Sequence, residues 1–583
     1  MKPLVCLAAL LIACRPSPRV VAPPPRALSV TSNIERADYA GSVACARCHA
    51  GIAAAWSASA MHNMTRVSTT ATVHAPFDGT GLDFKGDRVR AESENGERWV
   101  SVSSHAQGEH RYRVTRVIGG HHREDFVGIE PGGDGVERVL PISWLIESRR
   151  WRYKGYSVMV KERPGIFTSE PWARTCIFCH NTAPYLDSLI GTLAGETVPS
   201  YQGVVVDQHL PADHRWKVEV TNPEGLRRAV HKELRAIGAL PSETQPLSAI
   251  LLEGVKDTRN HFGADQLVEI GIGCESCHGG SREHVEDPRV RTVFGVKSPL
   301  VHTTPAASSR AESINRVCAR CHQVLFSRYP WTWEGQPRAN FQGGSNINSG
   351  EARDFLLGHC SGALACTSCH DPHSPDNRAR MDELEGADGD RVCQRCHTKY
   401  STPSAIAGHT HHLPEGKGAR CLACHMPRKN MSLELRLTRY HRIGSPTDTA
   451  RVEHDRPLEC ALCHADKSVE TIVSDMERLW TKHYDRTALS LLYGMDLSVN
   501  ALLVSLASPK PHEVATAAAA LGEAKSTAAI PLLIEQLANE IPLVREYVLH
   551  ALETIRGAPA PFSLHQDVTT ILEQANRWLE PRN

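Results

Sequence analysis

The feature that most constrains this chain is a five-residue pattern, Cys-x-x-Cys-His, that is repeated along most of its length. The eight copies begin at Cys45, Cys176, Cys274, Cys318, Cys366, Cys393, Cys421 and Cys460. With 19 Cys and 31 His among 583 residues, random placement would produce roughly 0.03 copies. Eight copies at one spacing therefore indicate that every copy serves the same chemistry.

Two cysteines three residues apart can form thioether bonds to the two vinyl groups of one haem, and the next His can bind the iron. We therefore interpret each copy as a covalent c-type haem site and predict eight haems. The predicted attachment residues are Cys45, Cys48, Cys176, Cys179, Cys274, Cys277, Cys318, Cys321, Cys366, Cys369, Cys393, Cys396, Cys421, Cys424, Cys460 and Cys463. The predicted proximal iron ligands are His49, His180, His278, His322, His370, His397, His425 and His464.

Three other uses of paired cysteines explain the pattern less well. Zinc ribbons also contain Cys-x-x-Cys, but they do not need a His directly after the second Cys of every pair. Thioredoxin-like proteins use a single copy at a junction between strand and helix. Disulfide bonds alone would not fix one spacing eight times. Covalent haem is the interpretation that accounts for every copy.

Residues 1–14 are predicted to be an export signal that ends at a lipidated cysteine. Lys2 is followed by an apolar run over residues 4–13, which is too short to span a bilayer as a helix. Residues 11–14 resemble the bacterial lipobox, in which cleavage precedes the cysteine, so Cys14 is the predicted lipidation site. An ordinary secretory signal cut nearby is the alternative.

Either signal would export the chain to the compartment where bacterial c-type haem is attached. We predict a periplasmic or outer-membrane lipoprotein of a Gram-negative bacterium, held at the membrane by lipid without spanning it. Residues 15–40 include Pro16, Pro18 and a run of three prolines at 23–25. Proline disfavours helix and central strand, so this segment is predicted to be an extended tether.

Residues 41–485 are predicted to form the haem domain, with short helices at 51–56 and 224–240 and much loop between the motifs. Within it, residues 66–165 alternate polar and apolar side chains at 88–91, 99–102 and 112–115, which predicts a small β-rich insertion. Only 6% of the residues are aromatic, so we expect the haems to fill the interior. The expected fold class is mainly α with extensive loop.

The last hundred residues contain no Cys and are predicted to be helical. The apolar residues of 469–480 fall on one helical face. The stretch 514–522 recurs in kind at 544–552, so residues 486–583 resemble HEAT-type helical repeats. The alternative is a plain helical cap on the haem domain.

Several stretches between residues 39 and 467 together carry a family resemblance. They are residues 39–45 with Trp56 and His62, residues 273–280 with His284, residues 369–373, residues 424–427 and residues 457–467. In combination they resemble the bacterial multihaem c-type cytochromes of the cytochrome c554 and doubled Cys-x-x-Cys-His group. The resemblance implies haem-based electron transfer and, in a minority of relatives, redox catalysis on small nitrogen or sulfur compounds.

The second axial ligand decides between electron transfer and catalysis, because iron with His on both faces has no open position. The histidines placed as in that family are His62, His284, His373 and His441. Further candidates are His122 or its neighbour His121, His412 or its neighbour His411, and His359.

Electron transfer through covalent haems is the function that the sequence favours. The alternative is an oxidoreductase that acts on a small nitrogen or sulfur compound at one open haem. The lack of a Lys ligand does not exclude it, because iron with a proximal His can also have an open face. Every motif ends in His, unlike the Cys-x-x-Cys-Lys of pentahaem nitrite reductases.

Cys360 is the one cysteine of the exported chain, beyond Cys14, that no motif uses. We expect it to be buried against a haem. A role beside a sulfur substrate is the alternative.

The expected partners are redox proteins, either other cytochromes or quinone-linked membrane complexes. Lys and Arg total 65, as do Asp and Glu, so charge predicts neither nucleic-acid binding nor attachment to a membrane face. The only contact with a membrane that the sequence predicts is through the lipid anchor. A third possibility is a docking protein that acts through its C-terminal repeats.

Overall fold

The computed structural model describes residues 28–154, 159–167, 171–195, 216–322, 329–334, 350–432 and 435–580. The predicted signal, its Cys14 and the first part of the predicted tether lie outside these residues. The second part of that tether is packed rather than free: Val30 and Ile34 are buried, and Ser29 forms a bridge with Arg291. The tether prediction was therefore wrong for residues 28–40, because their apolar side chains fill the surface next to the third motif.

The N-terminal half contains an eight-stranded antiparallel sheet in the order β2 to β8, with β1 paired to β5. The strands are β1 (Thr65–Val67), β2 (Asp78–Phe84), β3 (Asp87–Glu94), β4 (Glu97–Ser104), β5 (Gly108–Gly119), β6 (Arg123–Ile129), β7 (Arg138–Leu145) and β8 (Arg150–Tyr153). The hairpin between β3 and β4 turns at Asn95 and Gly96, which both have positive φ, as a tight two-residue turn requires. The outermost strands approach each other, since Trp151 of β8 donates to Thr80 of β2 at 3.0 Å.

This sheet corrects the expected fold class. A mainly α fold with a small β-rich insertion was predicted, but the strands occupy most of residues 65–153 and enclose a core of their own around Phe84, Phe126 and Ile142. The sequence analysis recognised parts of β3, β4 and β5, because their side chains alternate between buried and exposed. It missed β6 and β7, whose central residues are buried on both faces, so no alternation is visible there.

Short helices and loops carry the eight motifs. Between the sheet and the fifth motif lie α3 (Trp172–Thr175), α4 (Ile177–His180), α5 (Tyr185–Ala194), β9 (Lys217–Val220), α7 (Pro223–Ala236), α8 (Leu247–His261), α9 (Cys274–His278), α10 (Arg282–Glu286), β10 (Val301–Thr304), α11 (Arg310–Cys318) and α12 (Glu351–Leu357). The first motif joins α1 (Ser42–Ala46) to α2 (Ala50–Ser57), which confirms the helix predicted at 51–56. The helix predicted at 224–240 is confirmed by α7, which ends four residues earlier.

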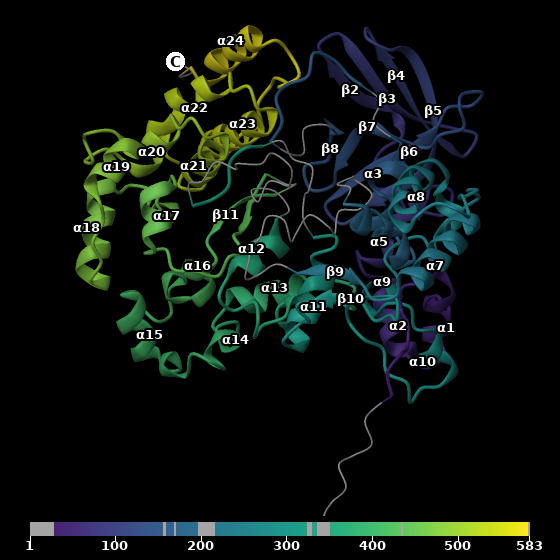
Figure 1. Cartoon of the computed structure of the whole chain (residues 1–583). Coiled ribbons are helices and arrows are strands. Elements are labelled where there is room, and N and C mark those ends of the chain that lie inside the picture. Colours follow the sequence, from purple (N-terminus) through teal and green to yellow (C-terminus); the bar gives the residue numbers. More distant parts are fainter. Residues whose placement is uncertain are drawn as a thin grey trace, which may run out of the picture.

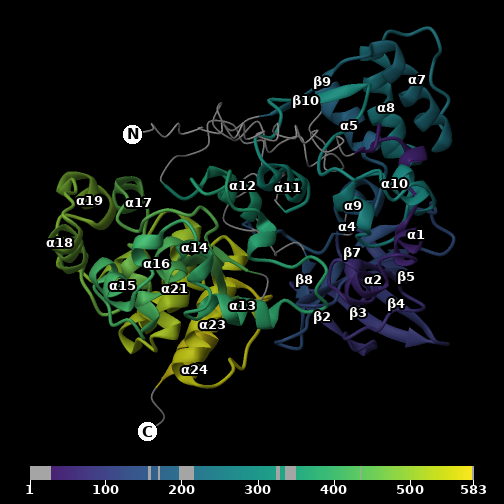
Figure 2. The same ribbon diagram turned by 90° about the horizontal axis from the view of Figure 1, so that it is seen from below.

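The later motifs follow the same plan. Their elements are the 3₁₀ turn η7 (Cys366–Ser368), α13 (Arg378–Glu385), α14 (Arg391–Gln394), α15 (Pro403–Thr410), α16 (Cys421–His425), β11 (Arg428–Met431), β12 (Leu437–Arg439), α17 (Thr449–His454) and the 3₁₀ turn η10 (Glu459–Leu462). The helices α16, α14, α11, α9 and α1 follow one another across the molecule in both views (Figures 1 and 2). These five motifs therefore form a row rather than scattered sites.

The C-terminal part is helical, as predicted. It contains α18 (Val469–Trp480), α19 (Arg486–Tyr493), α20 (Ala501–Ser505), α21 (Pro511–Glu523), α22 (Ile530–Gln536), α23 (Pro542–Arg556) and α24 (Val568–Leu579). The predicted apolar face is confirmed, since Val469, Ile472, Val473 and Met476 of α18 are buried. That these helices belong to the HEAT type stays a prediction.

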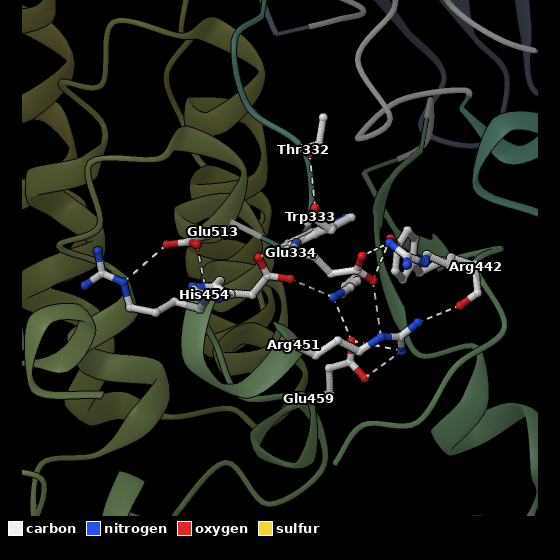
Figure 3. A network of polar contacts seen from close by, with 12 residues as sticks. Thr332, Trp333, Glu334, Arg442, Arg451, His454, Glu459 and Glu513 are labelled. Atoms are coloured by element: carbon white, nitrogen blue, oxygen red, sulfur yellow. Dashed lines mark hydrogen bonds and ion pairs between the residues drawn. The ribbon is translucent and has the colours of Figure 1, made fainter. Parts of the chain in front are cut away.

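A buried network of charges joins the C-terminal helices to the haem-binding part (Figure 3). Lys429 of β11, 2% exposed, lies 2.6 Å from Glu459 and 3.4 Å from Asp455. Arg456 pairs with Glu513 of α21 at 3.2 Å. These groups share one apolar core with β11, the eighth motif and α18–α24, so the C-terminal helices pack on their own chain.

Candidate haem sites

A large cavity lies where the motifs meet. Its volume is about 2070 Å³, which is at least twice the ~300–1000 Å³ of a pocket for one small ligand. Cysteines from the first six motifs line it: Cys45, Cys176, Cys179, Cys274, Cys277, Cys318, Cys321, Cys366, Cys369 and Cys393. None of the motif cysteines in the described residues forms a disulfide bond, so the sulfur atoms that line this cavity can form thioether bonds.

Five motif histidines face a second histidine across a gap of constant width. The ring centres are separated by 6.0–6.4 Å, and the planes differ by 6° to 35°. The pairs, motif histidine first, are His49 with His284, His278 with His373, His370 with His441, His425 with His409, and His464 with His412.

This gap has the width that an iron between two imidazoles requires. A bond from imidazole nitrogen to a transition metal is about 2 Å long, and each nitrogen lies about 1.1 Å from its ring centre, so two rings on opposite sides of one metal are about 6 Å apart. The five pairs match this separation. The residues present therefore fit haem iron with His on both faces.

Hydrogen bonds on the far side of several rings fix their orientation. The Nδ1 atoms of His284, His412, His425 and His441 lie 2.6–3.0 Å from backbone carbonyl oxygens. A carbonyl only accepts, so each Nδ1 must carry the proton, which leaves the Nε2 lone pair for a metal.

Burial keeps the rings in the form that binds metal. It lowers the pKa of His441 to about 4, and burial likewise lowers the pKa of His278, His370 and His425. Neutral imidazole is the ligand form, so these rings need not lose a proton at pH 7 before they bind iron.

Thiols of different motifs lie next to each other. A hydrogen bond between two thiols is the main cause that raises the pKa of one cysteine in each of four pairs: Cys45 with Cys274, Cys179 with Cys321, Cys318 with Cys366, and Cys421 with Cys393. Neighbouring motifs therefore present their attachment atoms to adjoining parts of the site.

Three motif histidines, His180, His322 and His397, have no second histidine ring stacked on them within the described ranges. Near His180, the cavity wall includes Arg123 and Asp125 of β6. Burial lowers the pKa of His180 to about 4, and the charge of Lys154 contributes.

The other predicted ligands have different surroundings. His62 lies against Trp56 rather than against a motif histidine, and its Nδ1 is buried without a hydrogen-bond partner among the described residues. His121 and His122 contact each other and line the cavity. His359 is exposed. Which of these four bind iron stays a prediction.

Sequence reasoning missed one of the histidines that face a motif histidine. His409 was not proposed, although it belongs to the His409-Thr410-His411-His412 cluster; it lies on α15, whereas His412 follows the end of that helix, and the two rings face different motif histidines. His411, the named alternative to His412, packs edge-on against Trp480. Cys360 is half-buried near Cys393 and Cys396, and burial raises the pKa of its thiol.

Comparisons with known proteins agree with the motif. A family model described as "Doubled CXXCH motif" matches residues 361–402, which hold the fifth and sixth copies. No curated protein matches the chain significantly. A solved structure entitled "Crystal Structure of Outer Cell Wall Cytochrome OcwA" is 14% identical, covers 93% of this chain and 100% of its own, and has a TM-score of 0.39. That score is too low to support an argument.

The matched family model and the eight copies of its motif support a chain with several covalently bound c-type haems, as in the multihaem c-type cytochromes. Proteins of this class carry out haem-based electron transfer and are typically extracytoplasmic. Within the part of the chain that the structure describes, no helix combines the length and the apolar character needed to cross a membrane.

Proposed function

We propose that this chain is an octahaem c-type cytochrome whose role is electron transfer. The observation that carries the proposal is the set of five histidine pairs at 6.0–6.4 Å. Iron with imidazole on both faces exchanges one electron between its ferric and ferrous forms without binding a substrate.

The residues of this chain supply ligands, spacing and burial. Carbonyl bonds to Nδ1 hold rings such as His284 and His441 in place, and cysteines of six motifs share one cavity. Exclusion of water and the identity of the axial ligands are the means by which a protein sets haem potentials. The neighbouring thiols of different motifs support attachment sites close enough for electrons to pass between their haems.

The mass of the purified protein tests the haem count. We expect the exported chain to exceed its polypeptide mass by eight haems. A variant in which Cys460 and Cys463 are both replaced by Ala should lose one haem, because each of the two thioether bonds of that haem needs one of these thiols. A gain of fewer than seven haems by the parent protein would contradict the octahaem proposal.

We also propose that the chain is exported and lipidated at Cys14, with redox proteins as partners. The support is the sequence of residues 1–14. Replacement of Cys14 with Ala should move the protein from the membrane fraction to the soluble fraction. Parent protein that is already soluble without detergent would rule out the lipid while leaving export intact.

A second function, reduction or oxidation of a small nitrogen or sulfur compound, is favoured by one observation. The wall of the cavity near His180 contains charged side chains, Arg123 and Asp125, and no histidine of the described residues is stacked on this ring. Electron paramagnetic resonance of the oxidised protein distinguishes the two functions. Low-spin signals that do not respond to nitrite, hydroxylamine or tetrathionate support a carrier, and a high-spin signal that shifts with one of them supports the enzyme.

A further inference from the structure

Three motif helices have their first backbone N–H capped by a side chain from a different motif. In each case the first cysteine of one motif donates to a polar side chain of another: Cys274 to Ser42 Oγ at 3.0 Å, Cys366 to Asn315 Oδ1 at 2.8 Å, and Cys421 to Asp390 Oδ1 at 2.8 Å. The first N–H groups of a helix have no partner within the helix, so an outside acceptor is needed. The residues just before these elements provide no side-chain cap of their own.

The three capping residues occupy the same position in their motifs. Ser42, Asn315 and Asp390 each stand three residues before the first cysteine of their own motif. The bonds therefore connect the first motif with the third, the fourth with the fifth, and the sixth with the seventh. The same three connections are the ones in which the first cysteines of two motifs lie side by side.

The equivalent position differs in the remaining motifs. In the third, fifth and seventh, which donate the N–H, it holds Gly271, Ala363 and Gly418. In the second and eighth motifs it holds Ala173 and Pro457. None of these side chains can accept a hydrogen bond, so the second and eighth motifs stand outside the pattern.

Burial and additional bonds make the caps rigid. The three capping residues are 1–5% exposed. Asn315 also donates to the carbonyls of Ser361 and Leu364 at 2.8 and 2.9 Å. Asp390 also accepts from Arg420 at 2.9 Å. Ser42 Oγ also donates to Glu269. Each cap therefore has a second polar partner, which holds it in place relative to the motif that it caps.

We propose that Ser42, Asn315 and Asp390 are positioning residues that hold the haem attachment sites in three pairs: first with third, fourth with fifth, and sixth with seventh. The proposal rests on the proposed function, since it requires haem at these motifs. Each cap sets the distance between the two motif helices of a pair and hence between their attachment sulfur atoms. The second and eighth sites then lie outside the three pairs. The second motif is next to the fourth, where the thiols of Cys179 and Cys321 are neighbours.

Circular dichroism in the Soret band tests the pairing, because two haems held close together couple and give a signal with two lobes of opposite sign. We compare Asp390→Ala, which removes the acceptor, with Asp390→Asn, which retains Oδ1. Asp388→Ala is the matched control, since this exposed carboxylate two residues away pairs with Arg391 instead. Ser42→Ala and Ser42→Thr give the same comparison in a different pair and serve if Asp390→Ala does not accumulate.

We expect Asp390→Ala to lose the part of the two-lobed signal that the sixth and seventh haems contribute, because this cap fixes those two attachment sites relative to each other. Asp390→Asn, Ser42→Thr and the control should keep it, and the haem count by mass should stay unchanged in all of them. A full signal in both alanine variants with all haems attached would overturn the pairing. Absence of haem from the parent protein would instead overturn the proposed function.

Discussion

The histidine rings of the candidate sites are held from the side that faces away from the gap. A carbonyl bond to Nδ1, as in His284 and His412, selects one tautomer and removes rotational freedom of the ring. An outer hydrogen bond of this kind is the usual way in which proteins orient a metal-binding imidazole. The bonds that orient these rings toward the gap therefore come from the protein's own backbone.

The pair of His409 and His425 gives a prediction at this scale. The rings are 6.1 Å apart and only 6° from parallel, so we expect His409→Ala to open one face of the iron bound by His425. Electron paramagnetic resonance of the oxidised variant should gain one equivalent of high-spin iron. His411→Ala is the control, because that ring packs on Trp480; an equal gain in the control would contradict the assignment.

Asp125 gives a prediction about acid stability. Burial alone would raise the pKa of this carboxyl, but Arg123 at 2.9 Å and Lys154 at 2.5 Å lower it to about 2. The pKa in the fold lies below that in the unfolded chain, so the contribution is complete above about pH 4 and is lost as the pH falls through 2.

Asp125→Asn should therefore reduce the free energy of unfolding at pH 7 by about 2 kcal/mol. The deficit should shrink as the pH approaches 2, where the parent carboxyl is itself protonated. Denaturant titration of the holoprotein at several pH values measures both effects. Asp134→Asn, at an exposed carboxylate beside Arg138, should change little; a deficit independent of pH at Asp125 would refute the electrostatic explanation.

Much of the candidate site is visible in the sequence at the residue scale, and one part is not. The Cys-x-x-Cys-His pattern specifies a local geometry, so its residues can be named without a structure. A distal ligand can come from anywhere in the chain: His284 follows the third motif yet faces His49 of the first. Position along the chain therefore does not identify the partner of a motif histidine, and iron binding by His62, whose ring lies on Trp56, stays a prediction.

At the scale of the elements, the placement of strand β11 depends on a cation, Lys429, that is buried in an apolar core. Lys429 lies 4.2 Å from the ring centre of Trp333 and 4.7 Å from that of Tyr440, and its ammonium group reaches Asp455 and Glu459. Burial of charge is costly unless every charge has a partner. The network therefore fixes how β11 sits against η10 and α17.

Lys429→Met should test this dependence, because the substitution keeps the volume but removes the cation paired with buried Asp455 and leaves Glu459 with Arg451 alone. We expect a loss of ~3–5 kcal/mol in the free energy of unfolding. Lys161→Met is the control: its partner Glu540 and Lys161 itself are both mostly exposed, and such pairs contribute less than about 1 kcal/mol. Equal losses in the two variants, measured by denaturant titration, would contradict the argument.

Element types were predictable where periodicity or helix signals are strong, as in α7 and α18. They were not predictable for β6 and β7, since a strand buried on both faces reads as a continuous apolar run. Val139, Leu140 and Ile142 of β7 are all buried, which nothing in the local sequence distinguishes from a short core helix. The size of the sheet follows from its pairing, which is a long-range property.

In the whole molecule, the C-terminal helices are tied to two other parts. The hydroxyl of Tyr547 on α23 accepts from the N–H of Ser432 at 2.8 Å. Neighbouring residues reach the sheet domain, since Glu546 pairs with Arg150 at 2.8 Å and Arg545 pairs with Glu162 at 2.5 Å. Figure 1 shows α23 and α24 beside the sheet. The helices therefore connect the sheet with the eighth motif.

This arrangement predicts that the haem-binding part and the C-terminal helices unfold together. Glu513 is fully buried at the junction and binds Arg456 and Lys510, so Glu513→Gln should leave buried cations without their carboxylate and lower the midpoint of thermal unfolding. Because one core spans both parts, the midpoint from Soret absorbance should fall as far as the midpoint from far-ultraviolet circular dichroism. Glu535→Gln, at an exposed position on α22, is the control and should leave both midpoints unchanged. A fall in the helical signal alone, with the Soret midpoint unchanged, would show that the C-terminal helices form an independent unit and would contradict the shared core.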